Sequence, residues 1–151
     1  MVKPDLNEVD VSTLMRYCME MCEQPWLEVE RKILESGKVD DIVIYAKRFK
    51  PQGWPEAEPK IAQSAEWSVY YAAVVLKYKR FPEGEPVIAQ DAKYSYLYAK
   101  DILGCNRFPE GEPVIAQDAK YSYLYAKDIL GCNRFPEGEP VIAQDAKYSY
   151  L

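Results

Sequence analysis

The chain has 151 residues, of which 48% are hydrophobic and 28% charged, and its formal net charge is −5. This acidic balance removes the electrostatic attraction that drives nucleic-acid binding. No apolar run approaches the roughly 18 residues of a membrane-spanning helix, and the first residues lack the charged-then-apolar pattern of a signal peptide. We therefore expect a cytoplasmic protein that binds neither nucleic acid nor membrane.

The N-terminal residues predict one helix, which covers the first repeat of the chain. Residues 1–9 resemble a lead-in, and Asp10 or Ser12 can cap a helix through LMRYCMEMCEQ that Pro25 ends. We predict that residues 1–25 form an N-terminal capping helix, because an array needs its first repeat covered. A soft, methionine-rich binding surface is the alternative interpretation of this stretch.

The C-terminal half of the sequence consists of one unit in successive identical copies. The unit begins at Arg80 as RFPEGEPVIAQDAKYSYLYAKDILGCN, recurs unchanged from Arg107 and begins again at Arg134, which gives a period of 27 residues. A fixed period of this length is typical of solenoids and other repeat arrays.

Diverged copies of the unit precede the identical ones. Residues 54–79 keep the Pro-Glu-x-Glu-Pro spacing and the pair Tyr71-Ala72, and a fainter copy from Trp26 ends in Tyr45-Ala46. A last trace lies in Tyr17-Cys18. We therefore predict one array of tandem helical repeats over residues 26–151, with units at about 26–53, 54–80, 81–107, 108–134 and, truncated, 135–151.

Each unit is predicted to hold a short helix, a tight turn and a longer helix. Pro86 must lie in the first turn of the short helix, because proline has no N–H to donate. Gly104 tolerates the left-handed dihedral angles that follow the longer helix. Capping residues precede the longer helix of every unit, namely Ser36, Ser64, Asp91, Asp118 and Asp145. The predicted fold is an all-α, right-handed α-solenoid of helix-turn-helix repeats with at least eight helices and no strands.

The helix expected over residues 65–78 differs from the others in its outer half. Val69, Tyr70, Ala73 and Val74 make it apolar nearly all round. A helix of this kind is normally buried. We expect it at the centre of the molecule or in an interface.

Repeated carboxylates are the candidate for catalysis. Glu83 and Glu85, with Glu110 and Glu112 one unit later, could act as acid–base pairs. Carboxylates at a helix start are instead stabilised by the helix dipole, with Arg107 of the next loop as a potential partner. The chain also has no histidine, the commonest general base at neutral pH. We expect no catalytic residue and no enzyme activity.

Tyrosine and lysine side chains form the candidate binding surface. On a helical wheel, Tyr94 and Tyr98 fall on the packing half of the longer helix, whereas Tyr96 falls on the outer half. Tyrosine buries contact area at a low cost in entropy and is favoured in binding surfaces. The residues predicted to contact a protein partner are Tyr96, Lys93 and Lys100 in one unit and Tyr123, Lys120 and Lys127 in the next.

The four cysteines predict neither a disulfide nor a metal site. Cys105 and Cys132 occupy equivalent positions on neighbouring helix pairs, roughly 8–10 Å apart and beyond the reach of a disulfide. Cys18 and Cys22 lie four residues apart, but no histidine and no further nearby cysteine completes a ligand set. We expect reduced thiols and no cofactor.

The block R-[FW]-P-E-[AG]-E-P, followed by a Tyr-Ala pair, resembles tandem repeats in proteins of large bacteriophages. The helix-pair plan is more distantly similar to tetratricopeptide arrays. The resemblance covers about residues 26–151 and implies an α-helical solenoid made in the cytoplasm of an infected bacterium, without catalytic residues. The identical copies indicate either recent duplication or an engineered or artificially extended array.

The C-terminal residues predict self-association. Leu151 takes the position of Leu97 in the middle of the longer helix, so the flank of an internal repeat would be exposed. We expect a two-fold dimer or a head-to-tail contact with the N-terminal helix, made by Val141, Ile142, Tyr148 and Leu151. The predicted function is a non-catalytic scaffold or inhibitor that presents a repeated surface to a protein partner. The alternative is a self-assembling structural protein.

Overall fold

A computed structural model of the protein describes residues 5, 6 and 8–149. Within these residues the protein is all-helical, with ten α-helices, one 3-10 helix, one π-helix and no strand. The prediction of an all-α fold with at least eight helices is therefore confirmed for this part of the chain. None of its helices is both long and apolar enough to cross a membrane.

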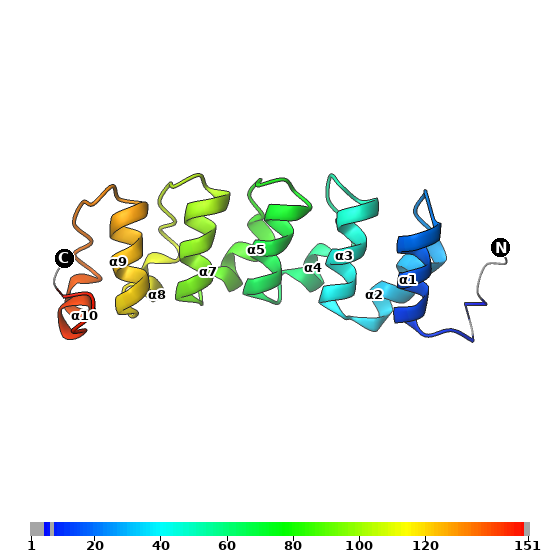
Figure 1. Ribbon diagram of the computed structural model, residues 1–151, viewed down its shortest axis with the longest axis horizontal. Coiled ribbons are helices and arrows are strands. Elements are labelled where there is room, and N and C mark those ends of the chain that lie inside the picture. The colour runs from blue at the N-terminus through cyan, green and yellow to red at the C-terminus, as the bar shows by residue number, and fades with distance from the viewer. Residues whose placement is uncertain (1–4, 7, 150–151) are drawn as a thin grey trace.

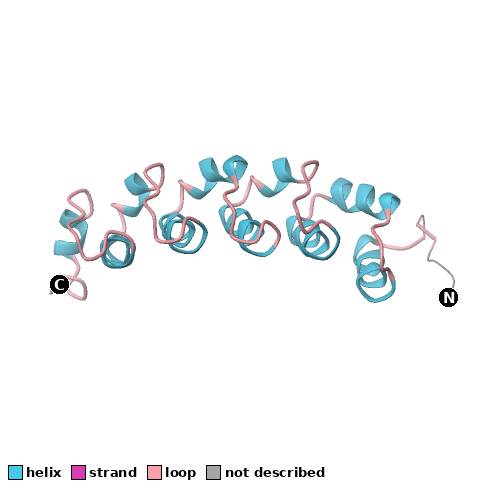
Figure 2. Cartoon of the chain, turned by 90° about the horizontal axis from the view of Figure 1, so that it is seen from above, coloured by secondary structure: helices cyan, strands magenta, loops and turns pink. Residues whose placement is uncertain are grey.

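The helices stand in two rows that bend into a shallow arc. Figures 1 and 2 show that one row lies on the concave side of the arc and the other on the convex side. The inner row comprises α1 (Val11–Met21), α3 (Val39–Phe49), α5 (Ala65–Val74), α7 (Ala92–Leu97) continued by the π-helix η2 (Tyr98–Ile102), and α9 (Ala119–Asp128). The outer row comprises α2 (Leu27–Ser36), α4 (Glu58–Ile61), the 3-10 helix η1 (Pro82–Gly84) with α6 (Glu85–Ile88), α8 (Glu112–Ile115) and α10 (Glu139–Gln144).

Side-chain caps start most helices of the inner row. The carboxylates of Asp10, Asp91 and Asp118 and the hydroxyl of Ser64 each accept a hydrogen bond from the backbone N–H three residues later. Such a cap satisfies one of the four N–H groups that a helix start leaves without a partner.

Two predicted caps differ in the structure. Ser36 is the last residue of α2, and its hydroxyl donates to the Ile33 carbonyl, while α3 begins after Lys38 without a side-chain cap. The stretch from Trp26 to Tyr45 is two residues longer than the equivalent stretch from Trp54 to Tyr71 (19 against 17), and α2 continues through Ser36 instead of ending before it. Asp145 accepts from the Lys147 N–H, but residues 146–149 form a turn rather than a helix.

The core is a continuous line of aromatic side chains between the two rows. The tyrosine of each Tyr-Ala pair lies against the first aromatic residue of the next unit. The ring centroids are 5.5 Å apart for Tyr45 and Trp54, 5.1 Å for Tyr71 and Phe81, 5.2 Å for Tyr98 and Phe108, and 5.4 Å for Tyr125 and Phe135. The four tyrosines are fully buried. Each unit therefore shields its neighbour from water, which is the main stabilising effect of burial.

Glycine allows successive units to approach closely. A Cβ atom on Gly111 would lie 2.6 Å from Phe108 Cδ1 and 2.6 Å from both Cβ and Oγ of Ser95. Ser95 is buried on α7, where its hydroxyl donates to the Ile88 carbonyl. The same contact recurs between Gly84 and Ser68 and between Gly138 and Ser122.

Candidate protein-interaction surfaces

The repeated carboxylates hold the units together. Glu85 accepts two hydrogen bonds of 2.8 Å from the Arg80 guanidinium. The Tyr98 hydroxyl donates to Glu85 at 2.7 Å and accepts from the buried Phe81 N–H at 2.8 Å. Glu85 thus ties the loop, the outer row and the inner row of one unit together.

The same arrangement recurs along the chain. Arg107 bonds Glu112, five residues later, so the expected bridge from Arg107 to Glu83 or Glu85 is wrong. The Tyr125 hydroxyl joins Glu112 to the Phe108 N–H at 2.8 and 2.9 Å. In the diverged units the tyrosine contacts are Tyr71 with Glu58 and Trp54, and Tyr45 with Glu30 and Trp26.

This bonding fixes the ionisation of the groups involved. Hydrogen bonds from Arg80, supported by the Tyr98 hydroxyl, hold the pKa of Glu85 below its usual value although partial burial opposes them. Burial raises the pKa of Tyr98 far above its ordinary value. Glu85 therefore stays a carboxylate at neutral pH, whereas a general acid needs a raised pKa.

The prediction that Tyr96 lies on the surface is wrong. Only 5% of Tyr96 is exposed, because α9 covers it. Its hydroxyl donates to Asp128 on α9 at 2.5 Å, and the Lys100 ammonium donates to Tyr96 at 2.9 Å and to Asp128 at 3.0 Å. The predicted contact residues Tyr96 and Lys100 thus bond two neighbouring helices of the inner row. Sequence reasoning missed Asp128, which lies 32 residues from Tyr96.

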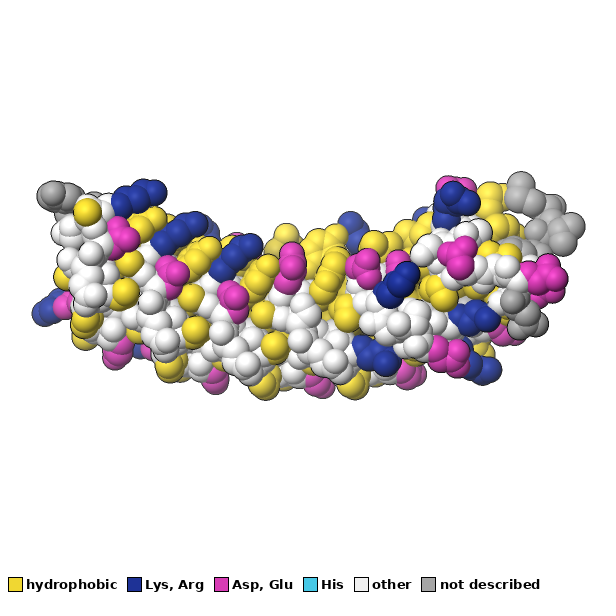
Figure 3. All heavy atoms as spheres, turned by 90° about the horizontal axis from the view of Figure 1, so that it is seen from below, with side chains coloured by type: hydrophobic (Ala, Val, Ile, Leu, Met, Phe, Trp, Pro, Cys, Tyr) yellow, Lys and Arg dark blue, Asp and Glu magenta, His cyan; other side chains and the backbone are white. Residues whose placement is uncertain are grey.

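The other predicted contact residues lie nearer to solvent. Lys93 and Lys120 are exposed, and their ammonium groups lie over the rings of Tyr94 and Tyr121 at 4.8 and 5.1 Å. Figure 3 shows basic side chains recurring along the hollowed edge of the C-terminal half, with hydrophobic side chains between them.

A shallow hollow on the inner row was not predicted. It has a volume of about 380 Å³ and is lined by Met19 of α1, Ile44, Lys47 and Arg48 of α3, and Tyr70 of α5. Ile44 is 41% exposed and Tyr70 39% exposed, at equivalent positions of neighbouring helices. We call this site the inner-row hollow. In the outer half of α5, which we expect at the centre of the molecule or in an interface, Tyr70 is exposed, whereas Val69, Ala73 and Val74 are half-buried.

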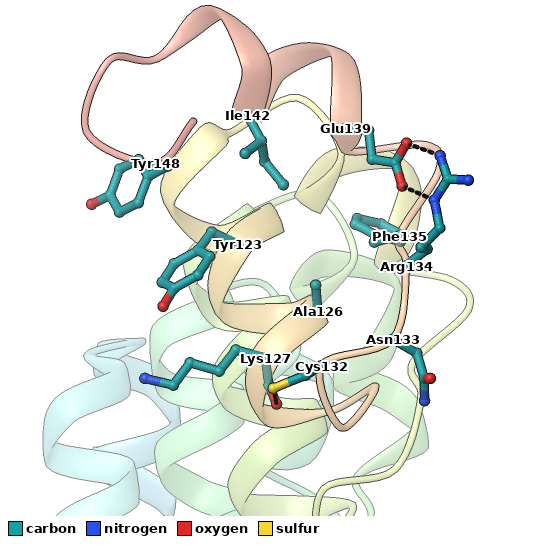
Figure 4. A pocket seen from close by; sticks show the side chains of 10 residues that line it. All are labelled: Tyr123, Ala126, Lys127, Cys132, Asn133, Arg134, Phe135, Glu139, Ile142 and Tyr148. Carbon is teal, nitrogen blue, oxygen red and sulfur yellow. Dashed lines mark hydrogen bonds and ion pairs between the residues drawn. The ribbon is translucent and has the colours of Figure 1, made fainter. Parts of the chain in front are cut away.

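A second pocket lies at the C-terminal end of the two rows, and we call it the terminal pocket. Its volume is about 530 Å³, and Figure 4 shows α9 on one side and the segment that leads into α10 on the other. The lining residues are Tyr123, Ala126, Lys127, Cys132, Asn133, Arg134, Phe135, Glu139, Ile142 and Tyr148. Four of the predicted contact residues line this pocket. Tyr123 and Lys127 lie on one side of it and face Ile142 and Tyr148 on the other. Val141 lies half-buried on α10, and Leu151 lies outside the described residues.

The cysteines are reduced thiols. Cys18 is buried, Cys22 is half-buried, and Cys105 and Cys132 are exposed. Among residues 5, 6 and 8–149, no three cysteine, aspartate or glutamate side chains gather as a metal site would require.

Comparisons with protein-family models, with curated proteins and with solved structures return no match to this chain.

Proposed function

We propose that the protein is a non-catalytic interaction scaffold or inhibitor, a right-handed α-solenoid of 27-residue repeats whose inner row receives a protein partner. The observation that carries this proposal is the inner-row hollow, where Ile44 and Tyr70 expose apolar surface on adjacent helices. Exposed apolar surface with a polar rim is typical of protein-interaction sites.

The chemistry of the hollow defines the partner. Ile44, Tyr70 and Met19 offer apolar contact area, and the cations of Lys47 and Arg48 border it. Exposed basic side chains also occur on later helices of the same row, as Lys93 on α7 and Lys120 on α9. A fitting partner inserts an aliphatic or aromatic side chain into the hollow and places carboxylates toward these cations.

The bonding of the carboxylates supports a non-catalytic role. Glu85 and Glu112 carry arginine and tyrosine bonds and lowered pKa values, and the chain has no histidine. We further propose that the protein acts in a bacterial cytoplasm during bacteriophage infection, on the resemblance of its repeat block.

Capture of partners from a bacterial lysate tests this function. The unmodified chain is compared with Ile44→Ser and Tyr70→Ala, which remove the apolar anchors. The matched controls are Leu27→Ser and Tyr78→Ala, which remove apolar side chains that are 66% and 62% exposed outside the hollow. A protein that the wild type and both controls retain, and that both hollow variants lose, supports the proposal. Equal retention by all five proteins would contradict it.

A self-assembling structural protein is the second candidate function. The terminal pocket favours it, since Ile142 is half-exposed there while its counterpart Ile115 is fully buried by the next helix.

A further inference from the structure

The terminal pocket repeats a groove that is filled elsewhere in the same molecule. In the preceding unit the Tyr125 hydroxyl enters the corresponding groove, accepts from the Phe108 N–H and donates to Glu112. Phe135 and Glu139 are the equivalent residues of the terminal pocket. Among the described residues no tyrosine hydroxyl reaches either of them, and Glu139 keeps only its bonds to Arg134. By analogy, the terminal pocket has the groups to receive a helix that presents a tyrosine.

The opposite end of the molecule presents such a helix. Tyr17 on α1 lies edge-on against Trp26 with ring centroids 6.3 Å apart, as each later tyrosine lies against the next unit's first aromatic residue. Cys18, which follows Tyr17, is fully buried like Ala46, Ala72 and Ala99, the alanines of three Tyr-Ala pairs. Tyr17 is only half-buried, and its hydroxyl forms no hydrogen bond with any described residue.

A second set of groups matches between the two ends. Asp128 follows Tyr125 by three residues and bonds Tyr96 and Lys100 of the preceding helix. Glu20 follows Tyr17 by three residues and is exposed. The equivalents of Tyr96 and Lys100 in the terminal pocket are Tyr123 and Lys127, whose ammonium lies 5.9 Å from the Tyr123 ring centroid. The carboxylate of Glu20 on α1 therefore matches the phenol of Tyr123 and the ammonium of Lys127 at the C-terminal end of a second molecule.

We propose that the terminal pocket binds α1 of a second copy of this chain, so that molecules associate head to tail. Tyr17 of one copy accepts from the Phe135 N–H of the other and donates to its Glu139, while Glu20 accepts from Tyr123 and Lys127. Figure 1 shows α1 standing in the same row as α9, so the contact continues the spacing of the inner row. A contact between different surfaces that does not close gives an open chain of molecules. This proposal does not depend on what the inner-row hollow binds.

One part of the molecule competes with the incoming helix. Tyr148 stacks on Tyr123 with ring centroids 5.6 Å apart, as Tyr121 lies against Tyr96 at 5.9 Å. By its spacing from Tyr17, Thr13 of the incoming helix falls where Tyr148 lies, so the turn over residues 146–149 has to move aside. Tyr148→Ala removes the stacked ring and is expected to strengthen head-to-tail association. A two-fold dimer that joins C-terminal ends through Tyr148 is weakened by the same change.

Sedimentation velocity at increasing protein concentration tests the contact. Glu20→Lys and Lys127→Glu are each expected to weaken association about tenfold or more, because each places like charges together. The double variant restores the attraction with reversed signs and should recover most of it. Tyr17→Phe is expected to lower the association constant about tenfold, the effect of one hydrogen bond to a charged acceptor. Tyr78→Phe is the matched control, since this tyrosine is 62% exposed and lines neither the terminal pocket nor the inner-row hollow.

The results separate this contact from the alternatives. Sedimentation coefficients that rise beyond a dimer, fall with each single charge reversal and recover in the double variant support the proposal. A wild-type monomer supports it only where Tyr148→Ala produces association with the same charge dependence. Monomers for both proteins at tens of micromolar, or association that ignores the charge reversals, would overturn it. Weaker association of Tyr148→Ala would assign the interface to the C-terminal ends instead.

Discussion

Removing one buried hydroxyl should reveal how strongly each unit is held together. Tyr98→Phe keeps the aromatic ring and its 5.2 Å contact with Phe108, so the packing of the ring is preserved. The change removes the hydroxyl that accepts from the Phe81 N–H and donates to Glu85. An N–H left buried without an acceptor costs about 1–3 kcal/mol. Glu85 keeps both hydrogen bonds to Arg80, so the loss of the bond from Tyr98 costs this carboxylate little. We expect the free energy of unfolding to fall by about 2 kcal/mol.

Urea unfolding followed by circular dichroism measures this loss. The transition midpoint should fall while the slope stays unchanged, because the variant exposes the same surface on unfolding. Tyr70→Phe is the control: its side chain is 39% exposed, and the expected change is within about 0.5 kcal/mol. Equal stability of the two variants would refute the argument that the Tyr98 hydroxyl holds the unit together.

Three further outcomes follow from the same contacts. Gly111→Ala should lower the free energy of unfolding by about 1–3 kcal/mol in urea titrations, because the new Cβ meets Phe108 and Ser95 at 2.6 Å. In acid, the stability that depends on Glu85 is complete above the carboxyl's unfolded pKa of about 4.3 and is lost as the pH falls through the lower folded pKa. Glu85→Gln should therefore flatten the acid part of the plot of unfolding free energy against pH. In alkali, the raised pKa of Tyr98 means that stability is complete below about pH 10 and is lost above it, so tyrosinate absorbance should rise together with unfolding.

The local signals in the sequence predicted the helices well. Capping by Asp91 and Asp118 follows from short-range chemistry, because the donor lies three residues from the acceptor. Gly104 takes a φ of +64° after η2, as its position after the longer helix predicts. Ser36 misled because its capping chemistry suits a helix start, whereas α2 continues through Ser36 and the next helix begins only at Val39.

Contacts between units were beyond the reach of a single helical wheel. The wheel places Tyr96 on the outer half of its helix, but it contains no information about α9, which covers that half and supplies Asp128. The paired carboxylates posed the same problem. Spacing alone does not reveal that Arg107 turns toward Glu112, five residues later, rather than back toward Glu83 or Glu85.

Equivalent positions on the inner row differ between the diverged and the identical units. Ile44, Tyr70, Leu97 and Leu124 occupy one position on four successive helices of the inner row. The first two differ from each other and are exposed by about two-fifths, whereas the two leucines are half-buried and identical. The identical units also use Tyr96 and Asp128 to bond each other. On the proposed function, selectivity for a partner would therefore depend on the diverged units, and adding identical units would lengthen the rows without changing what the hollow binds.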